Sequence, residues 1–142
     1  MKAGAANIIG TWRMISWTKT VVATRETADA MGPNPTGYIA YHADGRMMAL
    51  VVNSHRRPLK GSTPSDQEKI DLFNSMLAYS ARYTLTENVL THHVDATCNP
   101  AWIGAMKRPF RITGDRLVIS DAPGKDPITG EDVIYRMEFQ KV

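Results

Sequence analysis

Apolar and polar residues alternate along most of this chain, and a period of two is the pattern of half-buried β-strands. The alternation is clearest in residues 132–141, where one face holds Val133, Tyr135, Met137 and Phe139. Similar strand-like stretches cover residues 10–22, 79–85, 90–97, 108–113 and 116–120. The pattern predicts antiparallel strands that each have a core face and a solvent face.

The first of these strands, residues 10–22, is rich in β-branched and aromatic residues, which favour strands. Unbroken alternation places Trp12 and Met14 on one face. It places Arg13 and Trp17 on the opposite face. We therefore expect the two tryptophans to point away from each other.

Two further strands are predicted as a hairpin at residues 35–53, where apolar runs flank an Asp-Gly pair at positions 44–45. Asp-Gly favours a two-residue type I′ turn, which needs positive φ at both central residues. Such a turn would pair His42 with Met47 and put Tyr38 on the same face as His42. Both faces are largely apolar, which predicts that the hairpin is covered at least partly on its outer side.

One segment has helical rather than strand periodicity. Thr63 can cap a helix, Pro64 suits its first position, and Ile70, Phe73 and Leu77 follow at helical spacing. The segment predicts a helix from about residue 64 to residue 78, with its apolar stripe packed most simply across one end of a barrel.

The elements add up to an all-β fold of eight antiparallel strands, with one α-helix between strands 3 and 4. Most connections are short, as in an up-and-down meander. Closure into a barrel removes exposed edges, and an eight-stranded interior can hold one small ligand. The length of 142 residues predicts a single domain over residues 1–142.

The composition of the chain limits the kinds of partner that it is expected to bind. The net charge of +3 comes without a basic stripe, which argues against nucleic acid. The single cysteine, Cys98, fits a reducing compartment, and no apolar run has the length of a signal peptide core or a membrane span. We expect a soluble cytoplasmic protein without a membrane partner.

Several stretches resemble the bacterial and fungal lipocalin-like domain family. Gly10-Thr11-Trp12-Arg13 is similar to the Gly-x-Trp signature of lipocalins, and further similarities lie at residues 35–38, 41–47, 79–83 and 91–94. The resemblance implies an eight-stranded up-and-down lipocalin-like barrel around a small-molecule cavity, with Trp12 plugging one end. It implies no reaction and supplies no catalytic signature.

The candidate chemistry centres on His92, which shares an apolar strand face with Leu90 and Val94, whereas the adjacent His93 faces the other way. One interpretation is structural: a buried neutral histidine bonded to a tyrosine. The other is a general acid/base with Tyr79 or Tyr83 as a second catalytic candidate. Of the two roles, the buried structural histidine is the more common in proteins.

Seven side chains are candidates for the lining of one cavity, because aromatic rings combine apolar area with a polar group. They are Tyr38, His42, Tyr79, Tyr83, His92, Trp102 and Tyr135. These rings would also simply fill a small barrel. Any of Arg13, Arg82 and Arg111 that turned inward would be an anion-binding candidate. No metal-ligand spacing and no cofactor fingerprint occurs, so no metal and no cofactor is expected.

Three functions remain open at this point. The leading one is binding of a small, largely apolar or aromatic molecule in the cavity. The alternative is a cofactor-independent enzyme, such as a lyase, isomerase or cyclase, that uses the histidine and tyrosines for proton transfer. The third is an interaction protein, a homodimer that buries the apolar outer face of the hairpin.

Overall fold

The computed structural model describes residues 7–126 and 128–142. Its strands are β1 (Gly10–Val21), β2 (Thr27–Asp29), β3 (Thr36–Tyr41), β4 (Arg46–Val52), β5 (Met76–Leu85), β6 (Val89–Thr97), β7 (Gly104–Thr113), β8 (Arg116–Lys125) and β9 (Asp132–Lys141). The helices are α2 (Asp66–Asn74) and the 3₁₀ turn η1 (Pro100–Trp102). None of the described helices is long and apolar enough to cross a membrane.

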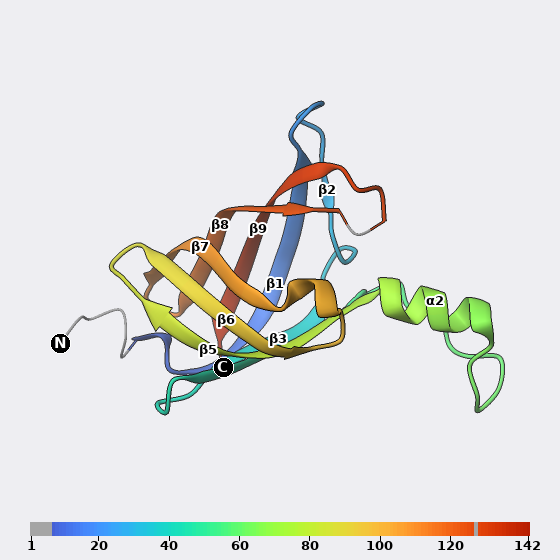
Figure 1. Cartoon of the computed structure of the whole chain (residues 1–142), viewed down its shortest axis with the longest axis horizontal. Helices are drawn as coiled ribbons and strands as arrows, with labels where there is room; N and C mark the ends of the chain where they lie inside the picture. The colour runs from blue at the N-terminus through green and yellow to red at the C-terminus, as the bar shows by residue number, and fades with distance from the viewer. Residues whose placement is uncertain (1–6, 127) are drawn as a thin grey trace.

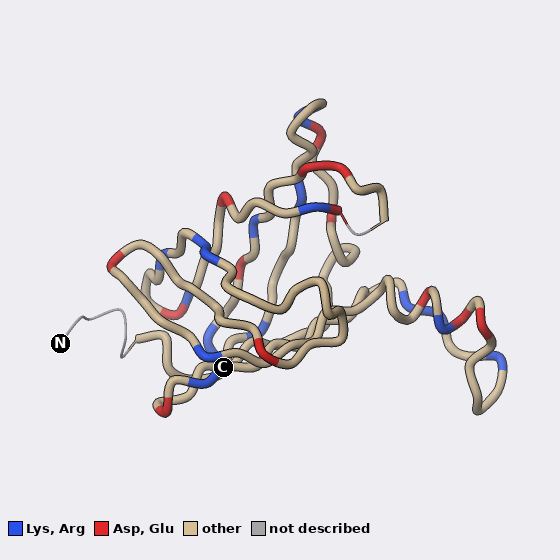
Figure 2. Tube along the Cα trace, in the orientation of Figure 1, with Lys and Arg blue, Asp and Glu red and all other residues tan. Residues whose placement is uncertain are grey.

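Eight of the strands form a closed antiparallel barrel, as predicted. The order is β1-β3-β4-β5-β6-β7-β8-β9, and β9 returns to pair with β1 from Trp12 to Val21. The short β2 pairs only with the end of β1, outside this circuit. Figure 1 shows the strands wrapped around one interior. Lysines, arginines and carboxylates are scattered over the strands and loops, and Figure 2 shows no basic stripe in the described part of the chain.

The predicted position of the helix, between strands 3 and 4, is wrong. The helix α2 follows β4 and precedes β5, because the sequence pattern missed β2. That strand has only three residues, all exposed, so it carries no alternation. The helix also begins later than predicted: Ser65, rather than Thr63, is its cap, in a capping box with Glu68.

The helix does not pack across the barrel end, contrary to the prediction. It projects away from the barrel (Figure 1), and none of its residues is buried. Ile70 and Phe73 are 54% and 46% exposed. The predicted stripe is cut short because the chain turns extended at Met76, so that Leu77 belongs to β5 rather than to the helix.

The β3–β4 hairpin is shifted by one residue from the predicted register. The turn has three residues rather than two: the His42 amide bonds Arg46 O at 2.8 Å, and Gly45 sits at φ +87°. Its geometry is that of a turn closed by a glycine bulge. Tyr41, not His42, therefore pairs with Met47. A one-residue shift reverses the faces of one strand relative to its partner.

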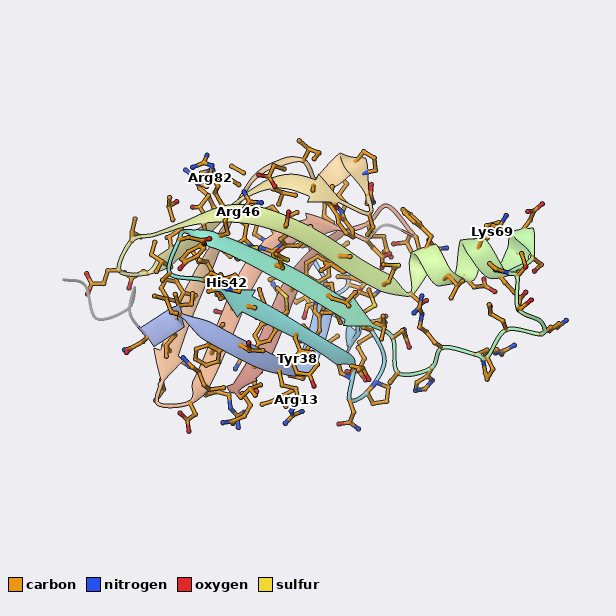
Figure 3. All side chains as sticks on the ribbon, turned by 90° about the horizontal axis from the view of Figure 1, so that it is seen from below. Arg13, Tyr38, His42, Arg46, Lys69 and Arg82 are labelled. Atoms are coloured by element: carbon orange, nitrogen blue, oxygen red, sulfur yellow. The ribbon has the colours of Figure 1, made fainter. Side chains whose placement is uncertain are left out.

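The shift turns Tyr41 into the core, where it is 1% exposed, and Tyr38 outward, where it is 48% exposed. Met48 and Leu50 on β4 share this outer face and are also about half exposed, at 58% and 53%. Figure 3 looks onto this surface and labels Tyr38 and His42 on it. The homodimer that would cover the face stays a prediction.

One end of the barrel is closed by Trp12, as the resemblance implied. Its side chain is completely buried, and Nε1 donates to the Ile8 carbonyl oxygen at 2.8 Å. The ammonium of Lys141 lies 4.7 Å from the centre of the Trp12 ring and covers it from outside. We call this the closed end.

Candidate functional site

A cavity of about 540 Å³ occupies the other end of the barrel, which we call the open end. Residues from β1, the C-terminal end of α2, β5, β7, β8, β9, η1 and neighbouring loops line it. Its aromatic side chains are Trp17, Phe73, Trp102 and Tyr135, and Met31 and Leu77 are among the apolar side chains beside them. The volume and the aromatic lining are those of a small-molecule site.

Trp17 reaches this cavity through an irregularity in β1. The ladder between β1 and β9 shifts between Met14 and Ser16, and this bulge changes the face on which the following residues fall. Trp12, Met14 and Trp17 therefore all point inward, so the predicted opposition of the two tryptophans is wrong. Trp17 is 6% exposed, and its Nε1–H has no hydrogen-bond partner within residues 7–126 and 128–142.

Tyr135 packs edge-on against Trp17, with ring centres 5.5 Å apart. Its ring also lies directly over Gly124 of β8, where a Cβ atom would be only 2.8 Å from the Tyr135 Cε2 atom. Glycine at that position lets the aromatic ring approach the strand backbone. The two rings together form one wall of the cavity.

Arg108 is the cation that the structure turns inward. On β7, Met106, Arg108, Phe110 and Ile112 are the half-buried positions and alternate with exposed ones. Arg13, Arg82 and Arg111, which would have been anion-binding candidates had they turned inward, are all exposed. Arg108 lies on the same strand face as Phe110 and Ile112, and this period of two was the signal that would have identified it as an inward-facing residue.

No oxygen atom of the described residues accepts a hydrogen bond from Arg108. Its Nη2 lies 3.2 Å from the Met106 sulfur, Nη1 lies 3.9 Å from the Met137 sulfur, and the buried Nε has no partner. Thioether sulfur is a weak acceptor. The guanidinium thus presents unsatisfied donors in the cavity wall.

The other charged groups of the cavity differ in their pairing. Lys19 pairs with Asp126, which is only 3% exposed, and Lys125 pairs with Asp132 at 2.6 Å. Burial raises the pKa of Asp126, but hydrogen bonds from Lys19 and from two backbone amides outweigh burial and hold the pKa below its ordinary value. Lys107, like Arg108, forms no ion pair within the described part of the chain.

His92 is buried inside the barrel, and both of its ring nitrogens have hydrogen-bond partners. Tyr41 Oη lies 2.7 Å from Nε2, and Tyr79 Oη lies 2.7 Å from Nδ1. Burial, and then the positive charges of Arg108 and His93, lower the pKa of His92 to about 3. The imidazole is therefore neutral at pH 7, with one ring nitrogen donating and the other accepting. We call Tyr41, Tyr79 and His92 the histidine cluster.

The structure separates the seven predicted lining residues. Trp102 and Tyr135 line the cavity. His92 and Tyr79 face the barrel interior but bond each other, and Tyr83 pairs with His92 in the ladder yet donates its hydroxyl to the His42 carbonyl oxygen at 2.7 Å.

Tyr38 and His42 are exposed on the outside, so their predicted place in the cavity is wrong. The cause is the turn length of the hairpin. Sequence reasoning missed Tyr41, Trp17 and Arg108, the first two because a bulge or a turn changed the face of the strand. Within the described residues, no three histidine, cysteine or carboxylate side chains converge on a point where a metal ion could sit.

Comparison with protein families agrees with this architecture. The family model described as the lipocalin-like domain matches residues 9–136. A search of curated proteins found no match. A solved structure of a redesigned β-barrel aligns with 100% of this chain and 97% of that chain, at 12% identity and a TM-score of 0.48. Because the family model covers nearly the whole length, the chain belongs to the lipocalin-like domain family.

Proposed function

We propose that this protein binds a small, largely apolar or aromatic molecule in the cavity at the open end of the barrel. The observation that supports it best is the cavity itself, about 540 Å³ in volume and walled by Trp17, Trp102 and Tyr135. A flat apolar ligand would bury its surface against these rings. Membership of the lipocalin-like family agrees with small-molecule binding in general.

The test is a titration with the neutral fluorescent arene N-phenyl-1-naphthylamine. Ala30 lines the cavity, so Ala30→Trp should fill part of it and weaken binding at least about tenfold. Ala43→Trp is the matched control, because Ala43 lies in the β3–β4 turn, outside the cavity lining. Absence of saturable binding by the natural chain, or equal weakening by both substitutions, would contradict the proposal.

The enzyme alternative has less support from the same geometry. Proton transfer by His92 would need a ring nitrogen open to a substrate, whereas both nitrogens are bonded to tyrosine hydroxyls at 2.7 Å. Its pKa of about 3 also lies far from neutral pH. We therefore assign His92, Tyr79 and Tyr83 no catalytic role in the proposed function.

A further inference from the structure

We propose that the ligand of this cavity is an acid: an apolar or aromatic body that carries one anionic group, bound by Arg108. The inference rests on the proposed function, since it names the chemical class of the molecule that the same cavity binds. Its starting point is the guanidinium in the cavity wall, which has donors but no oxygen acceptor within the described residues.

An inward-facing cation normally has a partner, because removing a charge from water is costly unless it is paired and hydrogen-bonded. Arg108 contacts two methionine sulfurs, which accept weakly and carry no charge. No described carboxylate lies within 4.0 Å of it. A carboxylate or sulfonate on a ligand would supply both the missing acceptors and the missing charge.

The titratable groups around Arg108 cannot supply that anion themselves. Its charge acts on Tyr41, Tyr79, His92 and Tyr135. Burial nevertheless raises the pKa of all three tyrosines, so they stay protonated phenols at pH 7. His92 stays neutral as well. These four groups are thus uncharged, and Asp126, the carboxylate in the cavity lining, is paired with Lys19 rather than with Arg108.

Two further features of the cavity favour an anion over a neutral ligand. Lys19 and Lys125 in the lining are each paired with a carboxylate, whereas Arg108 forms no ion pair within residues 7–126 and 128–142. The cavity therefore has uncompensated positive charge, which draws anions in. The indole N–H of Trp17 is a second unpaired donor in the same wall.

The experiment compares two probes that share one arene skeleton and differ by a sulfonate: 1-anilinonaphthalene-8-sulfonate and N-phenyl-1-naphthylamine. Arg108→Met should weaken binding of the sulfonate about 10- to 100-fold, the range for losing charged hydrogen bonds. The neutral probe should change by less than about threefold. Arg111→Met, an exposed position on the same strand, is the matched control and should leave both affinities unchanged.

A second measurement needs no substitution, so it tests the proposal even if Arg108→Met fails to fold. Dodecanoate should displace the neutral probe from the natural chain at a concentration at least about tenfold lower than dodecanol does. Equal competition, or equal loss of both probes in Arg108→Met, overturns the acidic ligand but leaves the proposed function standing. Failure of the neutral probe to bind the natural chain overturns the proposed function itself, and failure of the sulfonate alone overturns only the acidic ligand.

Discussion

The two halves of the barrel interior differ in whether their buried polar groups have hydrogen-bond partners. In the closed half, Trp12 and the histidine cluster have every ring nitrogen bonded. In the open half, Trp17 and Arg108 have buried nitrogens without a partner in the described residues. Buried polar groups are nearly always bonded, so a satisfied set indicates a structural role and an unsatisfied set indicates a partner outside the chain.

The same difference predicts which substitutions should change stability and which should change ligand binding. A satisfied cluster stabilises the fold, and removing one member leaves the others unpaired at a cost. An unpaired cation such as Arg108 lowers stability until a ligand arrives. We expect substitutions in the closed half to affect unfolding and those in the open half to affect affinity.

The largest expected effect is at Trp12. Trp12→Ala should lower the free energy of unfolding by about 3–5 kcal/mol, because it empties a completely buried aromatic site. Trp102→Ala, at the partly exposed rim of the cavity, should cost about 1 kcal/mol or less. Urea denaturation measures both, and similar costs for the two tryptophans would remove the distinction between the halves.

The adjacent histidines give the next test. His92→Ala should cost about 2–4 kcal/mol, since it leaves the hydroxyls of Tyr41 and Tyr79 without their partner. His93→Ala should change the free energy of unfolding by less than about 0.5 kcal/mol, because His93 is only partly buried. Equal costs in denaturant titrations would show that the cluster does not stabilise the barrel.

The pH dependence of stability isolates the same cluster. The pKa of His92 is lowered to about 3 in the folded chain from an ordinary value of 6.5. The unfolded chain therefore takes up the proton first, so this contribution is fully present above pH 6.5 and is lost as the pH falls towards 3. Between pH 6.5 and about pH 5 the loss should be roughly 1.5 kcal/mol.

His92→Gln is the control for this measurement and should flatten the pH dependence over the interval. The ion-paired Asp95, whose pKa Arg46 lowers to about 2, titrates below that window. An unchanged slope in His92→Gln would mean that another group is responsible.

The smallest expected effect has the opposite sign. Arg108→Met should raise the free energy of unfolding by about 1 kcal/mol, because an apolar side chain of similar length replaces an unpaired cation. Thermal unfolding of the ligand-free protein would measure it. A decrease in the free energy of unfolding of more than about 1 kcal/mol would show that Arg108 has a structural partner, like the bonded polar groups of the closed half.

Much of the fold follows from local pattern. The alternation in residues 132–141 predicted that Val133, Met137 and Phe139 point inward, and β9 has all three buried. Short connections and alternating strands predicted closure, because an open sheet would leave edges exposed. These predictions depend only on the period of a strand, which is a local property.

Which residues line the site depended on a bulge and a turn length, and the alternation of apolar and polar residues shows neither of them. A bulge after Met14 turned Trp17 into the cavity, and a turn of three residues rather than two turned Tyr41 in and Tyr38 out. Each irregularity adds one residue, and one residue reverses the face of everything that follows on that strand.

By itself, then, the sequence determined that the chain would form alternating strands, one helix and a closed barrel with Trp12 inside. Only the tertiary structure decided which aromatic rings meet and that Arg108 lacks a partner. Pairing of a buried charge depends on what the other strands bring within hydrogen-bond distance, and no local pattern records that distance.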